Sequence, residues 1–187
     1  MRAELLLFAG LLAAPALAED PVESTEPTVS EAEGLTAYAS VYTVLQHPRC
    51  LNCHPDGDVP LQTDDSTPHT MEITRLSVVS GLPCMTCHRE TGVLLPDTPN
   101  IPPADPHWRM PAREQAFENR TAAQLCAQLN DPARTGDRDL AGLVEHVRSD
   151  HLVASSWHSP RTPPPISQED FVAAFATWAD AGGPCPK

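Results

Sequence analysis

The sequence is poor in basic side chains. Its 187 residues include 12 Lys and Arg against 25 Asp and Glu, for a net charge of −13, and the single lysine is the last residue, Lys187. Binding to nucleic acid, or to an anionic membrane surface, requires clustered Lys and Arg. The composition therefore argues against both, and we expect the protein to prefer basic partners, with association rates that fall as salt rises.

Aromatic side chains are also scarce. Three Trp, two Tyr and four Phe stand beside 21 Pro, although aromatic residues normally dominate the burial in a core. The length allows one domain, or two at most. We therefore expect the interior to be undersupplied unless another group helps to fill it. The six Cys and eight His are the residues to examine for such a group.

Long apolar runs are missing from the chain except at its start. A positive residue, Arg2, precedes the apolar stretch Leu5 to Ala14, and Ala16-Leu17-Ala18 has the small-x-small form of a cleavage site. The stretch is shorter than the roughly 20 residues that span a bilayer. Residues 1–18 thus predict a signal peptide cleaved after Ala18, with an uncleaved anchor as the alternative. Export would place the cysteines in an oxidising compartment.

Residues 19–33 predict an acidic, disordered arm. They contain six acidic residues and two prolines but no basic or aromatic residue, a composition that cannot bury apolar surface and repels itself. The rest of the chain, 34–187, is expected to be a single domain.

Apolar spacing and capping residues predict four helices and no strand. The predicted helices are 35–46, 121–129 with a capping box at Thr121 and Gln124, 137–149 capped by Asp137, and a last helix from Ser167 to Gly182-Gly183. Two long irregular connections, 55–83 and 89–111, need something to wrap around in a compact domain. The expected fold is mainly α, with long Pro-rich loops.

Two pentapeptides carry the clearest chemistry. Cys50-Leu51-Asn52-Cys53-His54 is the first attachment motif, and Cys84-Met85-Thr86-Cys87-His88 is the second. Both have the Cys-x-x-Cys-His pattern that attaches haem c. Two thiols one helical turn apart bond to the two vinyl groups of the haem, and the adjacent His binds the iron. The sequence therefore predicts two covalently attached haems, with His54 and His88 as iron ligands.

Three other interpretations of these motifs are possible. A thioredoxin-like site uses one Cys-x-x-Cys in a βαβ setting, which this sequence does not predict. A four-thiol zinc site fits the spacing but does not need a His after each pair. Simple disulfides are the third. The complete Cys-x-x-Cys-His motif occurs twice, and a predicted export signal precedes it. Together these features favour haem attachment over the other three interpretations.

Each haem iron also needs a sixth ligand or an open position. We favour His69 for one iron and His146 for the other, because His69 follows the first motif in a Pro-His step and His146 lies beside Leu143 and Val147 on an apolar helix face. The second choices are His107, Met71 and Met110. His47 is too close to the first motif to cross the ring and is expected to cap or hydrogen-bond nearby.

The remaining cysteines, Cys126 and Cys185, are predicted to form a disulfide that pins the chain end to the helix at Thr121. A thiolate iron ligand is the alternative, and it would leave one odd cysteine. Arg49 and Arg89 flank the two motifs and are candidates to pair with haem propionates. Trp108 and Trp157 are candidates to pack on a haem, whereas Trp178 is expected to pack within its helix.

The chain resembles periplasmic dihaem c-type cytochromes. The two attachment motifs carry this resemblance, and a wider similarity runs over most of residues 46–186. Its residues include His47-Pro48-Arg49, Pro68-His69, Asp131-Pro132-Ala133-Arg134, Glu145-His146-Val147 and Gly183-Pro184-Cys185-Pro186. The similarity is to a small bacterial family labelled isoquinoline 1-oxidoreductase subunit. It implies a c-type cytochrome-like domain and an electron-accepting role beside a molybdenum hydroxylase.

These features predict a periplasmic electron carrier that relays single electrons between redox proteins, such as a molybdenum hydroxylase or a respiratory cytochrome. The alternative is a small haem enzyme, a peroxidase or oxyanion reductase, with one open or displaceable iron position. A third possibility is a sensor subunit whose haem state alters binding. The residues show no dedicated catalytic constellation, so the carrier is preferred.

Overall fold

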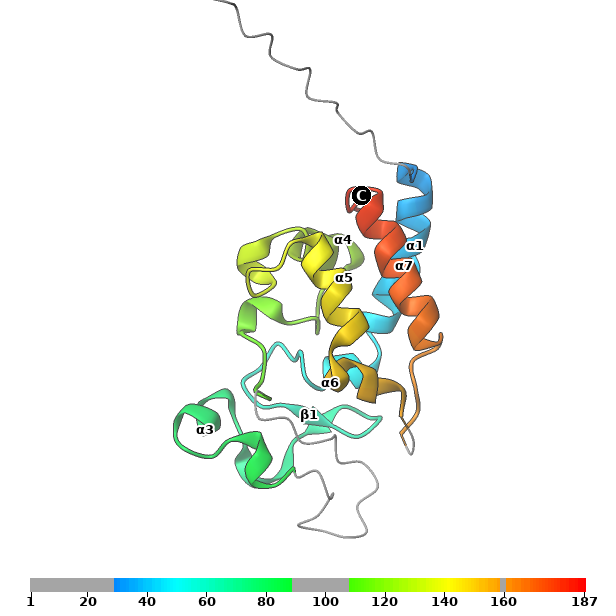
Figure 1. Cartoon of the computed structure of the whole chain (residues 1–187). Helices are drawn as coiled ribbons and strands as arrows, with labels where there is room; N and C mark the ends of the chain where they lie inside the picture. The colour runs from blue at the N-terminus through cyan, green and yellow to red at the C-terminus, as the bar shows by residue number, and fades with distance from the viewer. Residues whose placement is uncertain (1–28, 89–107, 159–160) are drawn as a thin grey trace, which may run out of the picture.

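The computed structural model describes residues 29–88, 108–158 and 161–187, which form a mainly helical fold, as predicted (Figure 1). Its longer helices are α1 (Glu31–Leu45), α4 (Ala122–Leu129), α5 (Leu140–Ser149) and α7 (Gln168–Asp180). The shorter ones are α2 (Pro48–Leu51), α3 (Arg75–Val79), α6 (His151–Ala154) and the 3-10 turns η1 (Thr70–Glu72), η2 (Cys84–Thr86), η3 (Arg113–Gln115), η4 (Pro132–Arg134) and η5 (Ser155–Trp157). The predicted signal peptide lies outside the described residues.

The first and last helices form the centre of the fold. α1 and α7 lie side by side and run in opposite directions (Figure 1). The ring centres of Tyr38 and Trp178 are 5.3 Å apart across this contact. Gly34 allows the close approach, because a Cβ atom at this position would lie 2.5 Å from the Cβ of Ala181.

α4 and α5 complete the hydrophobic core. α4 contributes Leu125, Cys126 and Leu129, and α5 contributes Leu143, Val144 and Val147, all of them buried. The aromatic residues concentrate in this core, which contains Tyr38, Phe171, Phe175 and Trp178. We expected too few aromatic side chains to fill the interior. For the four long helices this expectation is wrong, because their own side chains form the hydrophobic core.

Local capping explains where the helices begin. At the start of α1, the Ser30 N–H donates to the Glu33 carboxylate at 3.0 Å, and the Ser30 hydroxyl oxygen accepts from the Glu33 N–H at 3.3 Å. Because of this capping box, the helix begins at Glu31, and residues 31–33 are helical. The predicted acidic arm, 19–33, is therefore three residues too long. Its residues 19–28 lie outside the described part of the chain.

The α5 cap corrects a second boundary. Asp139, and not Asp137, is the N-cap, because its carboxylate accepts a hydrogen bond from the Gly142 N–H at 2.8 Å. Asp137 instead has a positive φ of 61° in the preceding turn. The caps of α4 and α7, Thr121 and Ser167, are as predicted.

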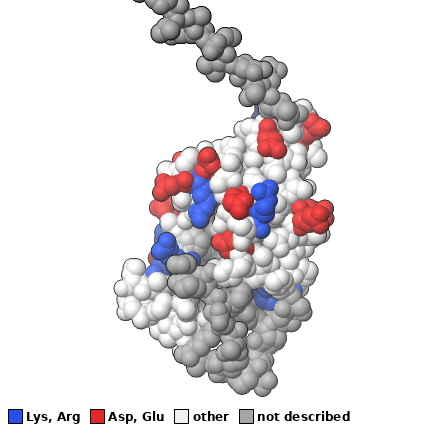
Figure 2. Space-filling view, viewed as in Figure 1, with Lys and Arg blue, Asp and Glu red and all other residues white. Residues whose placement is uncertain are grey.

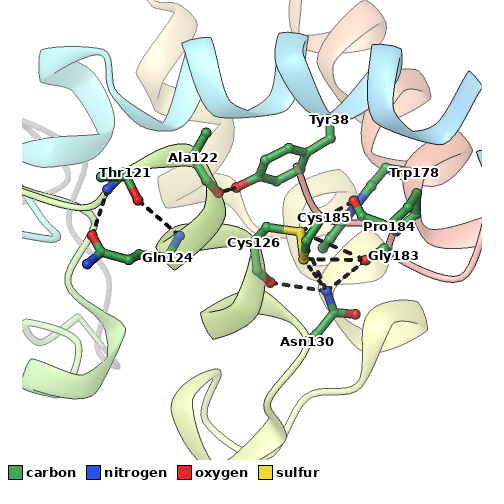
Figure 3. Close-up of a disulfide and its surroundings, with 10 residues drawn as sticks. All are labelled: Tyr38, Thr121, Ala122, Gln124, Cys126, Asn130, Trp178, Gly183, Pro184 and Cys185. Carbon is green, nitrogen blue, oxygen red and sulfur yellow. Dashed lines mark hydrogen bonds between the residues drawn. A yellow bond between two sulfur atoms is a disulfide. The ribbon is translucent and has the colours of Figure 1, made fainter. Parts of the chain in front are cut away.

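A disulfide joins Cys126 to Cys185, which confirms the predicted pair (Figure 3). It ties α4 to the segment that follows α7. Two side chains hold the same segment: Asn130 Nδ2 donates to the Gly183 carbonyl at 2.9 Å, and Trp178 Nε1 donates to the Pro184 carbonyl at 3.0 Å. The C-terminus is thus fixed to the helical core.

Residues 52–88 form a less regular part below α5 and α6 (Figure 1). Here β1 (Leu61–Gln62) pairs antiparallel with β2 (Thr67–Pro68), and Leu61 faces Pro68 in the register. The prediction of no strand was wrong, because two-residue strands are too short to show an alternating pattern. Nor is 55–83 wholly irregular, since it also contains η1 and α3.

Within the described ranges, no helix is long and apolar enough to cross a membrane.

Candidate functional site

The first attachment motif directly follows α1. The chain turns at His47, whose Nδ1 accepts a hydrogen bond from the Arg49 N–H at 3.3 Å and caps α2, as predicted. The His54 N–H donates to the Cys50 carbonyl at 3.1 Å, so the motif is one turn of helix. Cys50 and Cys53 are free thiols and partly buried, and Cys50 packs against the helical core.

The imidazole of His54 is held from two sides. Its Nδ1 lies 2.8 Å from the Gln115 carbonyl oxygen, and its ring stacks on Phe117 with ring centres 3.8 Å apart. A carbonyl can only accept, so Nδ1 carries the proton. Burial lowers the pKa of His54 to about 4, which keeps the ring neutral near pH 7. The lone pair of Nε2 is therefore available to bind a metal.

His146 on α5 shares this electrostatic environment. Its Nδ1 lies 3.3 Å from Oδ2 of Asp150, and burial lowers its pKa. Burial lowers the pKa of His54 most, the hydrogen bond to Gln115 opposes this, and His146 has a smaller lowering effect, so the two imidazoles are within electrostatic range. His146 is thus within electrostatic range of the first attachment motif, which the sequence left open.

The second attachment motif lies in η2, on the less regular part of the molecule. Cys84 is partly buried, Cys87 is exposed, and both are free thiols. The ring of His88 lies 4.6 Å from the Trp108 ring and 6.2 Å from the His69 ring, centre to centre. His69 is thus associated with the second motif. Its Nδ1 hydrogen-bonds to the Thr70 carbonyl oxygen, which again leaves Nε2.

The two motifs are near each other. Burial raises the pKa of the Cys53 thiol, and the Cys84 thiol contributes in the same direction. Even so, within residues 29–88, 108–158 and 161–187, no group of three or more His, Cys, Asp or Glu side chains is placed to hold a metal ion. The arrangement therefore does not support the four-thiol zinc interpretation.

Three arginines surround the first attachment motif. Arg49 donates to the Ser156 carbonyl at 2.8 Å and also binds the Ser155 carbonyl. Arg161 donates to the Thr63 carbonyl at 2.7 Å, the same oxygen that the Asn52 side chain binds at 2.8 Å. Arg49 thus joins the motif to the η5 turn, and its predicted pairing with a propionate stays a prediction.

The third arginine, Arg75, did not stand out in the sequence. Its Nη2 donates to the carbonyls of Pro55 at 3.1 Å and Gly57 at 3.3 Å, next to His54. Gln115 was missed too, because it acts through its backbone carbonyl, which every residue has. Phe117 likewise carries no signal in its local sequence that would identify a ring stacked on His54.

The other predicted residues have different positions. Met71, a second-choice ligand, is 81% exposed, and Met110 is partly buried. Trp157 packs on Phe171 and donates to the Ile166 carbonyl at 2.7 Å, which places it beside the helical core and not in an open loop. Trp178 is buried in the core, as predicted. His107 and Arg89 lie outside the described residues.

Apolar side chains are exposed around the second attachment motif. Leu76 is 70% exposed and Val79 is 80% exposed, both on α3, and Met71, Leu82 and Met85 are exposed as well. Residues 76–88 contain no Asp, Glu, Lys or Arg. Figure 2 shows this uncharged surface at the lower left, where α3 lies, and acidic side chains over the helical part.

Comparisons of the chain with protein-family models, with curated proteins and with solved structures found no match.

Proposed function

We propose that the chain is an exported dihaem c-type cytochrome that transfers single electrons between redox proteins. In this proposal Cys50 and Cys53 hold one haem, Cys84 and Cys87 hold the other, and His54 and His88 are their proximal ligands. The observation that carries the proposal is that the motif histidine His88 has a second histidine, His69, beside it. His146 is within electrostatic range of His54.

The hydrogen bonds of three of these four histidines support iron binding, whereas Nδ1 of His88 is buried without a partner among the described residues. A metal-binding imidazole almost always donates its second ring N–H to a carbonyl or carboxylate, which orients the ring. His54, His69 and His146 each have such a partner on Nδ1, namely Gln115, Thr70 and Asp150. In all three, Nε2 is the atom left for a metal.

The proximity of His69 and His88 also supports a shared metal ion. Both side chains would supply an imidazole nitrogen to the iron of the second site. The rings of His69 and His88 are 6.2 Å apart. Beside them, an apolar macrocycle would cover part of the exposed apolar surface on α3 and η2, which otherwise costs solvation free energy.

A bound haem would supply iron that cycles between two oxidation states. The chain itself supplies the two thiols and the proximal histidine of each site. Ligation by two histidines lowers the reduction potential relative to His/Met ligation. The net charge of −13 favours a basic partner. A molybdenum hydroxylase, as the family label implies, and a respiratory cytochrome are the partners we propose.

The haem count tests this proposal directly. The full-length chain is expressed in a bacterium that attaches haem c to exported proteins, and the denatured protein is weighed by mass spectrometry. We expect two covalent haems in the wild type and one in each of the variants C50A/C53A and C84A/C87A. The control C126A/C185A removes two cysteines outside the motifs and should retain two haems. A wild-type mass without covalent haem overturns the proposal.

The spin state separates the carrier from the enzyme. If His69 and His146 are the sixth ligands, EPR of the wild type shows two low-spin haems that do not react with CO, peroxide or nitrite. His69→Ala and His146→Ala should each convert one haem to high spin, whereas His158→Ala, at an exposed position, should change neither. A high-spin haem that reacts with peroxide in the wild type would instead support the haem enzyme.

A further inference from the structure

Within the described residues, Arg75 shares its nearest carboxylate with a second arginine. Its Nε lies 3.5 Å from Oδ1 of Asp58, but Arg113 already holds that carboxylate with two hydrogen bonds of 2.8 and 2.7 Å. Two guanidinium groups thus share one carboxylate. These three residues alone have a net charge of +1 beside the first attachment motif, and the Glu114 carboxylate also acts on Arg75.

Two donors of this guanidinium are also buried without an acceptor. The Arg75 side chain is 15% exposed, and its Nε and Nη1 atoms are both buried. Within the described part of the chain, neither atom has a hydrogen-bond partner. A buried donor left unpaired costs about 1–3 kcal/mol, and more when it is charged. Nε faces Asp58, whereas Nη1 points away from it, so an anion beside Nη1 would satisfy that donor with a charge-assisted hydrogen bond.

The location identifies the kind of anion. Nη2 of Arg75 donates to the carbonyl of Pro55, the residue that directly follows His54, so the guanidinium lies beside the iron ligand of the first motif. Burial is the main cause of the lowered pKa of His54, and the positive charge of Arg75 lowers it further. A haem bound at this motif brings two propionate groups, each a carboxylate that needs a partner when it is removed from water.

We infer that Arg75 binds a propionate of the haem attached to Cys50 and Cys53, using the donor Nη1. This inference rests on the proposed function. Arg113 has a supporting part, because it occupies Asp58 and so leaves the charge of Arg75 available. A cation at the propionate favours the reduced haem, and the pairing therefore raises the reduction potential of the first haem relative to the same haem without it.

Potentiometric titration of the holo-protein tests the inference. In Arg75→Gln, we expect two covalent haems by mass, a downward shift of one of the two potentials and a changed propionate bending band in the resonance Raman spectrum. Arg75→Lys, which keeps the charge, should restore most of the potential. The matched control is Arg148→Gln, which removes an exposed guanidinium paired with Glu145 on α5 and should shift neither potential.

The failures of the two proposals are distinguishable. Two haems in Arg75→Gln with both potentials and the propionate bands unchanged overturn the role of Arg75 and leave the dihaem proposal intact. No covalent haem in the wild type overturns the dihaem proposal itself. If Arg75→Gln does not fold, the resonance Raman spectrum of Arg75→Lys tests the inference instead. Its compact ammonium would replace the planar guanidinium as the partner of the propionate, so propionate bands identical to those of the wild type would again contradict the inference.

Discussion

His146 and Asp150 form a pair at the junction of two helices. Nδ1 of His146 lies 3.3 Å from Oδ2 of Asp150, one turn further along the chain. The other oxygen, Oδ1, accepts hydrogen bonds from the N–H groups of Leu152 at 2.8 Å and Val153 at 3.3 Å and so caps α6. One carboxylate therefore fixes both the start of a helix and the orientation of an imidazole.

Asp150→Asn is expected to separate these two functions. Asn caps helices about as well as Asp, so the free energy of unfolding should change by no more than about 0.5 kcal/mol. An amide nitrogen facing Nδ1 can only donate, which moves the imidazole proton to Nε2, the atom proposed to bind iron. Loss of such a partner typically weakens metal binding about 10- to 100-fold. EPR should show one haem becoming high spin.

The control for this prediction is Asp139→Asn, at the N-cap of α5, where the amide oxygen can also replace the carboxylate oxygen. It should leave both the stability and the EPR spectrum as in the wild type. Two unaltered low-spin haems in Asp150→Asn would contradict the role of Asp150 in orienting His146.

Gly34 should be intolerant of any side chain. A Cβ atom here would lie 2.5 Å from the Cβ of Ala181 and 2.7 Å from Cγ of Pro184, and neither atom can move without shifting α7 or the chain end. Gly→Ala inside a helix normally stabilises by about 1 kcal/mol. We expect Gly34→Ala to destabilise instead, by about 1–3 kcal/mol, because the contact is overpacked.

Gly57 provides the comparison for Gly34, because a Cβ atom there meets nothing within 4 Å. Gly57→Ala should change the free energy of unfolding by no more than about 0.5 kcal/mol. Urea denaturation of the two variants measures both effects, and equal stability of Gly34→Ala and the wild type would show that α1 and α7 pack less closely than described.

The Cys126–Cys185 disulfide should contribute strongly to stability. The bond closes a loop of 59 residues, and the chain-entropy relation gives about 4 kcal/mol for a loop of this length. C126A/C185A should therefore unfold at a markedly lower urea concentration than the wild type. A reducing agent should lower the wild-type midpoint and leave that of the variant unchanged. Equal midpoints for the wild type with and without reductant would contradict the prediction.

Asp64 should make stability depend on pH at the acid end. Its carboxylate accepts from the Thr162 hydroxyl at 2.7 Å and the Thr162 N–H at 3.1 Å, and these hydrogen bonds lower its pKa from 3.8 to about 2. Because the folded-state pKa lies below the unfolded one, the contribution of Asp64 is complete above pH 4 and is lost as the pH falls toward 2.

Thr162→Val tests this explanation by removing the shorter hydrogen bond. The pKa of Asp64 should then rise toward 3.8, and its pH-dependent contribution should shrink. Asp64→Asn should abolish that contribution altogether. Urea unfolding at pH 6, 4 and 2.5 measures these differences, and a difference between the wild type and Asp64→Asn that is the same at every pH would exclude the mechanism.

The parts of the fold with local signals were predictable from the sequence. The capping box at Thr121, the cap at Ser167 and the apolar stripe through Tyr38 depend on residues within one or two turns. The α5 cap was placed two residues early, because Asp137 and Asp139 are the same residue type and only the backbone of the turn distinguishes them. The β1–β2 hairpin has too few residues to show a pattern.

The candidate site also has parts that the sequence predicts and parts that it does not. Both attachment motifs are contiguous and were found directly, whereas the association of His146 with His54 joins residues far apart in the sequence. Sequence reasoning selected His69 and His146 but could not assign either one to a motif. Arg75 is informative only through its burial and the lack of an acceptor for its donors, which no sequence pattern records.

The packing of α1 on α7 sets the order in which the protein can assemble. The first helix of the fold needs the last one as its partner, and the disulfide closes on a cysteine two positions from the C-terminus. The core therefore closes only after the chain through α7 and Cys185 has been synthesised. Under the proposed function, haem attached to Cys50 and Cys53 before that point would meet an open chain and become part of the surface on which the rest folds.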